Sequence, residues 1–194
     1  MLNKKIYAAL KTFSLSLLVF QCLTAYASDN HGELDGFYVT KKGWAESQEL
    51  RPGDPIAGEQ LGRFKVVLKR KGWDSLPDSE KDRIRKKLVI SGVFHGIVQD
   101  PFGQQGGPFI EHKFSNLSRD GVLYTLNDKA SIVPGEPCTF SIQETLNIER
   151  GAGIYQDLQP GGIVTLEGTI NYCTSQNDFE VVPNKGGLCF GVCE

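Results

Sequence analysis

Three titratable side chains interrupt stretches of the sequence in which apolar and polar residues alternate. They are His95, His112 and Glu144, and each has an apolar residue two positions away on both sides. Side chains at positions i and i+2 of a strand point to the same face of a sheet. The pattern therefore predicts that all three point into an apolar interior. A hairpin folded about residues 103–104 would place His95 opposite His112.

This residue set is suited to two kinds of chemistry. Burial and mutual charge shift the pKa values of such groups, which general acid/base catalysis in an isomerase or cyclase requires. Two imidazoles and a carboxylate also match the ligands of zinc and similar ions in a metal-dependent enzyme. The simpler interpretation is favoured: each group bonds to backbone or water, or points outward because the register differs by one residue. No cofactor is therefore expected, and a metal at these three residues is the alternative.

A second candidate site is a cationic segment. Residues 63–87 carry 10 basic and 4 acidic side chains, whereas the whole chain has a formal net charge of -2. The overall balance argues against a nucleic-acid partner. The residues that could instead attract an anionic surface are Lys69, Arg70, Lys71, Arg85, Lys86 and Lys87. The alternative is a solvated surface helix around residues 76–87, with acids early and bases late as the helix dipole favours.

The cysteine residues predict a disulfide framework. Cys22 lies in the leader described below, and the four that follow are Cys138, Cys173, Cys189 and Cys193. An even number of cysteines in an exported chain is typical of two disulfides. We expect Cys138–Cys173 and Cys189–Cys193, because Cys138 directly precedes one predicted strand and Cys173 directly follows another. That register sets Asn171 opposite Phe140, which conflicts with the apolar faces unless a bulge shifts one strand.

Alternation with a period of two predicts that the chain after residue 87 is mainly β. The predicted strands span 88–99, 109–117, 122–133, 139–148 and 163–172, with a shorter one over 179–182. Asp120-Gly121 is a strong signal for a tight hairpin. Consecutive strands joined by turn-rich links favour an antiparallel β-barrel, with a β-sandwich as the alternative.

Composition distinguishes three parts of the chain. Residues 1–27 have a basic start, a short apolar stretch and Ala25-Tyr26-Ala27, the pattern of a secretory signal peptide. We expect residues 28–62 to form an irregular N-terminal segment. We expect residues 63–194 to form a disulfide-stabilised antiparallel β domain that includes the basic helix. No stretch reaches the ~20 apolar residues that span a bilayer. We therefore expect a secreted or periplasmic protein without a transmembrane anchor.

A glycine-rich stretch carries a resemblance to a known family. Gly151-Ala152-Gly153-Ile154-Tyr155, then Pro160-Gly161-Gly162, then a strand broken by Gly168, resembles a stretch in allene oxide cyclase-like and dirigent-like barrels. Those families have Gly-Thr-Gly before the aromatic residue, and this chain has Ala152 in place of the Thr. The resemblance covers about 20 residues and implies a closed eight-stranded barrel with an apolar interior. The resemblance does not identify any catalytic residue in this chain.

Together these features predict an exported, disulfide-stabilised barrel that acts as a binding module for a small apolar ligand or a partner surface. One alternative is an isomerase, cyclase or metal-dependent enzyme that uses His95, His112 and Glu144. Another is adhesion to an anionic surface through the basic segment. The sequence does not decide between a binding protein and an enzyme, nor does it specify the ligand or the oligomeric state.

Overall fold

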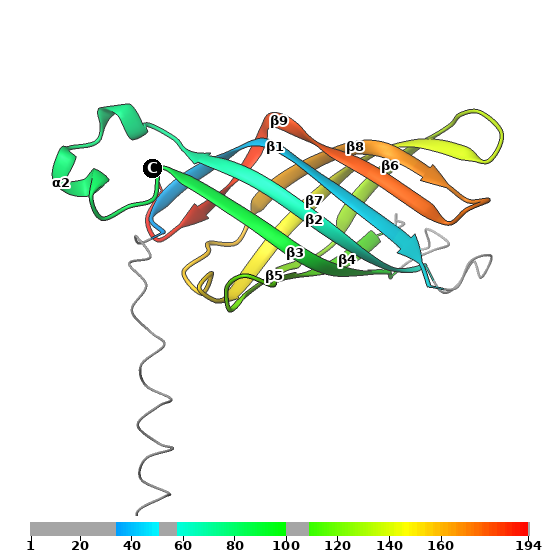
Figure 1. Cartoon of the computed structure of the whole chain (residues 1–194), viewed down its shortest axis with the longest axis horizontal. Coiled ribbons are helices and arrows are strands. Elements are labelled where there is room, and N and C mark those ends of the chain that lie inside the picture. The colour runs from blue at the N-terminus through cyan, green and yellow to red at the C-terminus, as the bar shows by residue number, and fades with distance from the viewer. Residues whose placement is uncertain (1–33, 51–57, 100–108, 194) are drawn as a thin grey trace, which may run out of the picture. The chain divides into compact units, whose positions relative to one another are not determined.

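The chain forms a closed antiparallel β-barrel (Figure 1). The computed structural model describes residues 34–50, 58–99 and 109–193, so the expected signal peptide lies outside the described residues. The strands are β1 (Gly36–Glu49), β2 (Glu59–Arg70), β3 (Lys87–Val98), β4 (Phe109–Asn116), β5 (Gly121–Thr125), β6 (Asp128–Pro134), β7 (Thr139–Gly153), β8 (Gly162–Asn171) and β9 (Gln176–Phe190).

The barrel closes because β9 returns to pair with β1. β5 and β6 occupy successive parts of one position between β4 and β7, so the nine strands fill eight positions. Closure removes the free edges of the sheet, which would otherwise expose unpaired backbone groups. The predicted barrel is thus confirmed, and the sandwich alternative is wrong.

The N-terminal part of the barrel differs from the sequence prediction. Residues 36–49 form the 14-residue strand β1, and β2 begins at Glu59, within the segment expected to be irregular. Two features hide the strand period here. The buried residues of β1 include the small or polar side chains of Thr40, Ala45 and Ser47. A register shift between Thr40 and Lys42 also interrupts the alternation.

The surface helix is much shorter than predicted. In place of a helix around residues 76–87, the chain forms a 3-10 turn, η1 (Trp73–Ser75), and a four-residue helix, α2 (Asp78–Lys81). Neither element buries a side chain or has a side-chain cap, and short helices without such support are marginal. The chain instead becomes extended at Lys87, which pairs with Lys69 of β2 and begins β3. No helix of the described part of the chain is long and apolar enough to cross a membrane.

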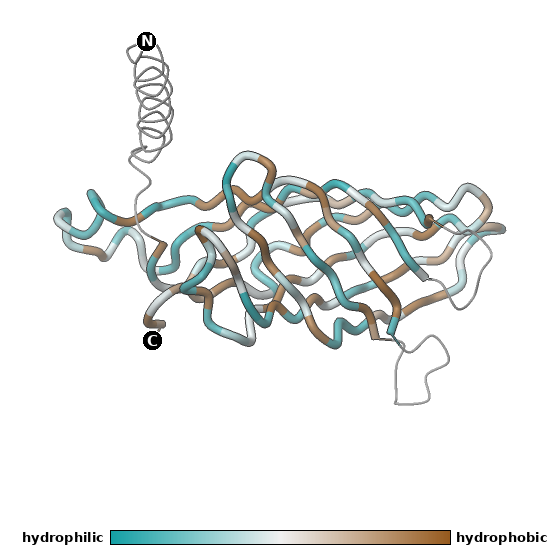
Figure 2. Tube along the Cα trace, turned by 90° about the horizontal axis from the view of Figure 1, so that it is seen from below, coloured by the Kyte–Doolittle hydropathy of each residue, from teal (hydrophilic) through white to brown (hydrophobic). Residues whose placement is uncertain are grey.

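The barrel interior is a packed apolar core. Hydrophobic and polar residues alternate along the strands, as Figure 2 shows. The ring centroids of Phe64 and Phe114, two members of this core, lie 4.9 Å apart in an edge-to-face contact. Tyr38 and Phe190 are fully buried where β1 begins and β9 ends, with ring centroids 5.8 Å apart. Side chains therefore fill much of the interior.

The structure forms both disulfides that the sequence favours, Cys138–Cys173 and Cys189–Cys193. The register of β7 and β8 sets Phe140 opposite Ile170, one residue away from the pairing inferred from the cysteines. The apolar faces therefore match without a bulge. Cys138 lies just outside β7 with a φ of 72°, and this backbone turn brings its Cα within 5.4 Å of that of Cys173.

Candidate functional site

The two strand histidines point to opposite sides of the barrel wall. His112 pairs with Gly96 and is 4 % exposed, whereas His95 pairs with Lys113 and its side chain is 37 % exposed. The hairpin between β3 and β4 is therefore shifted by one residue from the predicted register. His95 lies on the outer face, where its Nε2 is 2.7 Å from Glu59 Oε1. The predicted convergence of His95 with His112 and Glu144 is wrong.

Gly96 makes room for the His112 imidazole. A Cβ atom at Gly96 would lie 2.7 Å from the ring nitrogen Nε2, closer than real Cβ contacts. Phe94 and Phe114 flank the ring, with centroids 5.6 Å and 5.5 Å away. The strand register and these neighbours hold the imidazole inside the barrel.

Asp128 is a site residue that the sequence prediction missed. The expected continuous strand over residues 122–133 is interrupted between β5 and β6, where Asn127 has a φ of 54°. Because of this interruption, both Thr125 and Asp128 are buried, although an unbroken strand would point them to opposite faces. The Asn127-Asp128 pair, of residue types that favour turns, was the available signal for this interruption.

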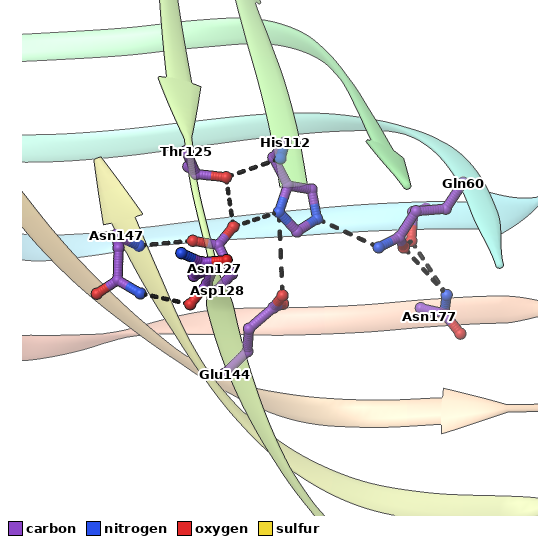
Figure 3. A network of polar contacts seen from close by, with 9 residues as sticks. Gln60, His112, Thr125, Asn127, Asp128, Glu144, Asn147 and Asn177 are labelled. Carbon is purple, nitrogen blue, oxygen red and sulfur yellow. Dashed lines mark hydrogen bonds and ion pairs between the residues drawn. The ribbon is translucent and has the colours of Figure 1, made fainter. Parts of the chain in front are cut away.

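The Asp128 carboxylate accepts three hydrogen bonds, drawn in Figure 3. His112 Nδ1 lies 2.7 Å from Oδ2, which also accepts the Thr125 hydroxyl. The backbone N–H of Asn147 donates to Oδ1 at 2.6 Å. Asp128 has no exposed surface, so these bonds replace the water that a carboxylate would otherwise bind.

Glu144 reaches the same point from β7, as predicted. It is 3 % exposed, and its Oε1 lies 4.0 Å from His112 Nδ1 without a hydrogen-bond partner among the described residues. Burial raises the pKa of the Glu144 carboxyl above its usual range. The His112 ring opposes this rise in pKa, and the Asp128 carboxylate adds to it. We call His112, Asp128 and Glu144 the interior cluster.

A chain of polar side chains extends from His112 across the barrel. Gln60 Nε2 lies 3.3 Å from His112 Nε2, so this nitrogen accepts and Nδ1 carries the proton donated to Asp128. Ser47 donates to Gln60 Oε1 at 2.7 Å, and Asn177 Nδ2 donates to Ser47 at 3.1 Å. The Asn177 amide is buried, and its Oδ1 has no partner among the described residues.

The interior cluster has the parts for two kinds of chemistry. A carboxylate that orients an imidazole, next to a carboxyl of raised pKa, is suited to moving protons. One imidazole nitrogen and two carboxylate oxygens, all within 4.8 Å of one another, are also suited to holding a cation.

Replacing Glu144 with Gln should stabilise the protein increasingly as the pH rises. The native pKa of Glu144 is raised, so the folded state binds more protons than the unfolded state between the two pKa values. The stability associated with this carboxyl is full below the unfolded pKa and is lost as pH rises through the folded one. We expect E144Q to be about 1–3 kcal/mol more stable than the parent at pH 8.

The measurement is denaturant unfolding of both proteins at pH 5 and pH 8 with a chelator present. Glu180→Gln, on an exposed position of β9, is the matched control and should follow the parent at both pH values. A stability difference between E144Q and the parent that does not change with pH would contradict the assignment.

Strand pairing brings the predicted basic residues together at the end of β2 and the start of β3. Lys69 pairs with Lys87, and the backbone N–H of Arg70 bonds to the carbonyl of Lys86. Lys86 also lies over the Trp73 ring at 5.9 Å and 3.9 Å from Asp74. Arg85 is partly buried, and this burial lowers the pKa of its guanidinium. Binding of an anionic surface by this group stays a prediction.

Comparisons of the chain with protein-family models, with curated proteins and with solved structures find no match.

Proposed function

We propose that the protein is an exported binding module that holds a small ligand inside the barrel at the interior cluster. Two disulfides on a closed barrel support a protein built for an oxidising compartment outside the cytoplasm. The interior cluster supplies groups that can recognise a ligand, on strands whose positions the closed sheet restricts.

The observation that carries this proposal is the uncompensated Glu144 carboxyl. Its Oε1 is buried and has no hydrogen-bond partner among the described residues. Leaving a buried polar group unpaired costs about 1–3 kcal/mol, more when it is charged. A ligand with a positive charge or a hydrogen-bond donor would remove that cost.

The same observation amends the expected ligand. An apolar ligand would need space among the core side chains, but these already pack into one cluster, in which Phe64 of β2 contacts Phe114 of β4 with ring centroids 4.9 Å apart. The interior oxygen atoms that lack a hydrogen-bond partner among the described residues, Glu144 Oε1 and Asn177 Oδ1, would suit a polar ligand. We therefore propose a ligand that is cationic or donates hydrogen bonds, in place of an apolar one.

The test is native mass spectrometry of the untagged protein, recovered from the exported fraction of an expressing bacterium. The polypeptide mass should correspond to cleavage after Ala27 with two disulfides, and a fraction should carry additional bound mass. E144Q should lose this bound mass, whereas E180Q should keep it. The proposal is overturned if the parent protein carries no bound mass and if small cations and amines do not raise its melting temperature.

A further inference from the structure

We propose that the ligand of the interior cluster is a divalent transition-metal ion, held by His112 Nδ1, Asp128 Oδ2 and Glu144 Oε1. This inference rests on the proposed function, because it identifies the ligand class of the same site. The three side chains come from β4, β6 and β7, and all are buried.

The donor atoms are close to the spacing that one ion requires. His112 Nδ1 is 2.7 Å from Asp128 Oδ2 and 4.0 Å from Glu144 Oε1. Ligands at about 2.0–2.2 Å from a tetrahedral ion are roughly 3.3 Å from each other. The shorter distance must therefore lengthen and the longer one shorten, each by about 0.6–0.7 Å. Side-chain rotations of that size leave the strands in place.

Charge also favours a divalent ion. Two ionised carboxylates would place two negative charges in the barrel interior. The side chains that contact them or the His112 ring there are uncharged: Gln60, Phe94, Phe114 and Thr125. An ion of charge +2 would neutralise both carboxylates. It would also give Glu144 Oε1 the partner that it lacks among the described residues.

The groups around the donor atoms are those of a metal site. The Asn147 N–H and the Thr125 hydroxyl already orient the Asp128 carboxylate. Gln60 bonds to the distal nitrogen of His112, and half a turn of its amide would let Oε1 accept an N–H from that nitrogen. Mixed imidazole and carboxylate donors suit zinc, manganese or ferrous ions better than cuprous ions.

Binding at His112 Nδ1 requires the other tautomer of the neutral imidazole. In the structure this nitrogen donates its proton to Asp128, so the metal–nitrogen bond replaces that N–H. The ring carries a single proton, which moves from Nδ1 to Nε2, so the imidazole stays neutral. Any proton on Glu144 is released to solvent when its carboxylate binds the ion. No electron transfer is involved, and both carboxylates remain intact.

The experiment uses the untagged mature chain, treated with a chelator and then dialysed. Zn²⁺ is titrated calorimetrically, and Co²⁺ binding is followed by its visible absorption. Ions are added both to the folded protein and during refolding with the disulfides intact, because the cluster is buried. We expect one ion per chain. We also expect E144Q and His112→Gln to weaken binding more than about 100-fold, since loss of an outer partner alone costs about 10–100-fold.

The outer-face pair of His95 and Glu59 provides the matched control, because substitutions there change a histidine and a glutamate outside the interior cluster. His95→Ala and Glu59→Gln should bind Zn²⁺ as the parent does. The proposal is overturned if the folded parent binds no stoichiometric ion, if E144Q binds as tightly as the parent, or if H95A abolishes binding. Of the substitutions, Glu144→Gln alters the size and shape of the side chain least. Circular dichroism serves as the check that each variant is folded.

The outcomes also separate this inference from the proposed function. An organic ligand that the parent retains and E144Q loses, without Zn²⁺ binding, would leave the interior cluster as the binding site and exclude the metal. Absence of both an organic ligand and a bound ion would overturn both proposals.

Discussion

Replacing Asp128 with Ala is expected to lower the free energy of unfolding by about 3–5 kcal/mol, because three buried donors lose their acceptor and each unpaired group costs about 1–3 kcal/mol. The variant leaves the ring Nδ1–H of His112, the backbone N–H of Asn147 and the Thr125 hydroxyl without their acceptor. All three donors meet at the interruption between β5 and β6. Their loss should therefore loosen this part of the barrel first.

Denaturant unfolding followed by circular dichroism measures the difference. Asp178→Ala is the matched control, because Asp178 is an exposed acid on β9 and its removal should change stability little. Hydrogen exchange should be faster at Asn147 in D128A than in the parent. A D128A variant as stable as the D178A control would show that the carboxylate does not hold this interruption in place.

The two disulfides should contribute unequally to stability. Cys138 and Cys173 are 35 residues apart in sequence, whereas Cys189 and Cys193 are 4 apart. A disulfide restricts the unfolded chain more when it closes a longer loop. On this basis the double substitution of Cys138 and Cys173 by Ser should cost about 3–4 kcal/mol, and that of Cys189 and Cys193 about 2 kcal/mol.

Guanidinium unfolding of the two double variants under non-reducing conditions compares these contributions. Peptide mapping of the parent without reduction is the control for the pairing itself. A larger loss for the short-loop variant than for the long-loop variant would contradict the expected order. It would indicate that the C-terminal bridge acts on the folded barrel and not mainly on the unfolded chain.

The sequence by itself determined the architecture and much of the cluster. Period-two alternation located β3, β4, β7 and β8, part of β9 and, as a single strand, β5 with β6, because one face of each strand must meet the apolar interior. The same alternation placed His112 and Glu144 inside, since each has inward-facing apolar neighbours two residues away. Both disulfide pairs also followed from the cysteines and the predicted strand ends.

Local pattern was less informative where the chain is polar or charged. Only residues 37–39 of β1 were predicted as a possible short strand, and the rest was missed because several inward positions are small or polar, as Thr40 and Ser47 are. The length of the helix was overestimated because acidic residues early and basic residues late in the segment favour the helix dipole. Packing, however, decides whether a short helix forms. At Lys87, pairing with β2 outweighed that local preference.

Only the tertiary structure decided which polar groups meet. His95 and His112 have similar neighbours in sequence, yet one faces solvent and the other the interior. A one-residue change in the β3–β4 register reverses every side chain of one strand, and only packing around the whole barrel selects the register. Asp128 joins His112 and Glu144 because the chain turns at Asn127, which reverses the faces of the β6 residues relative to an unbroken strand over 122–133.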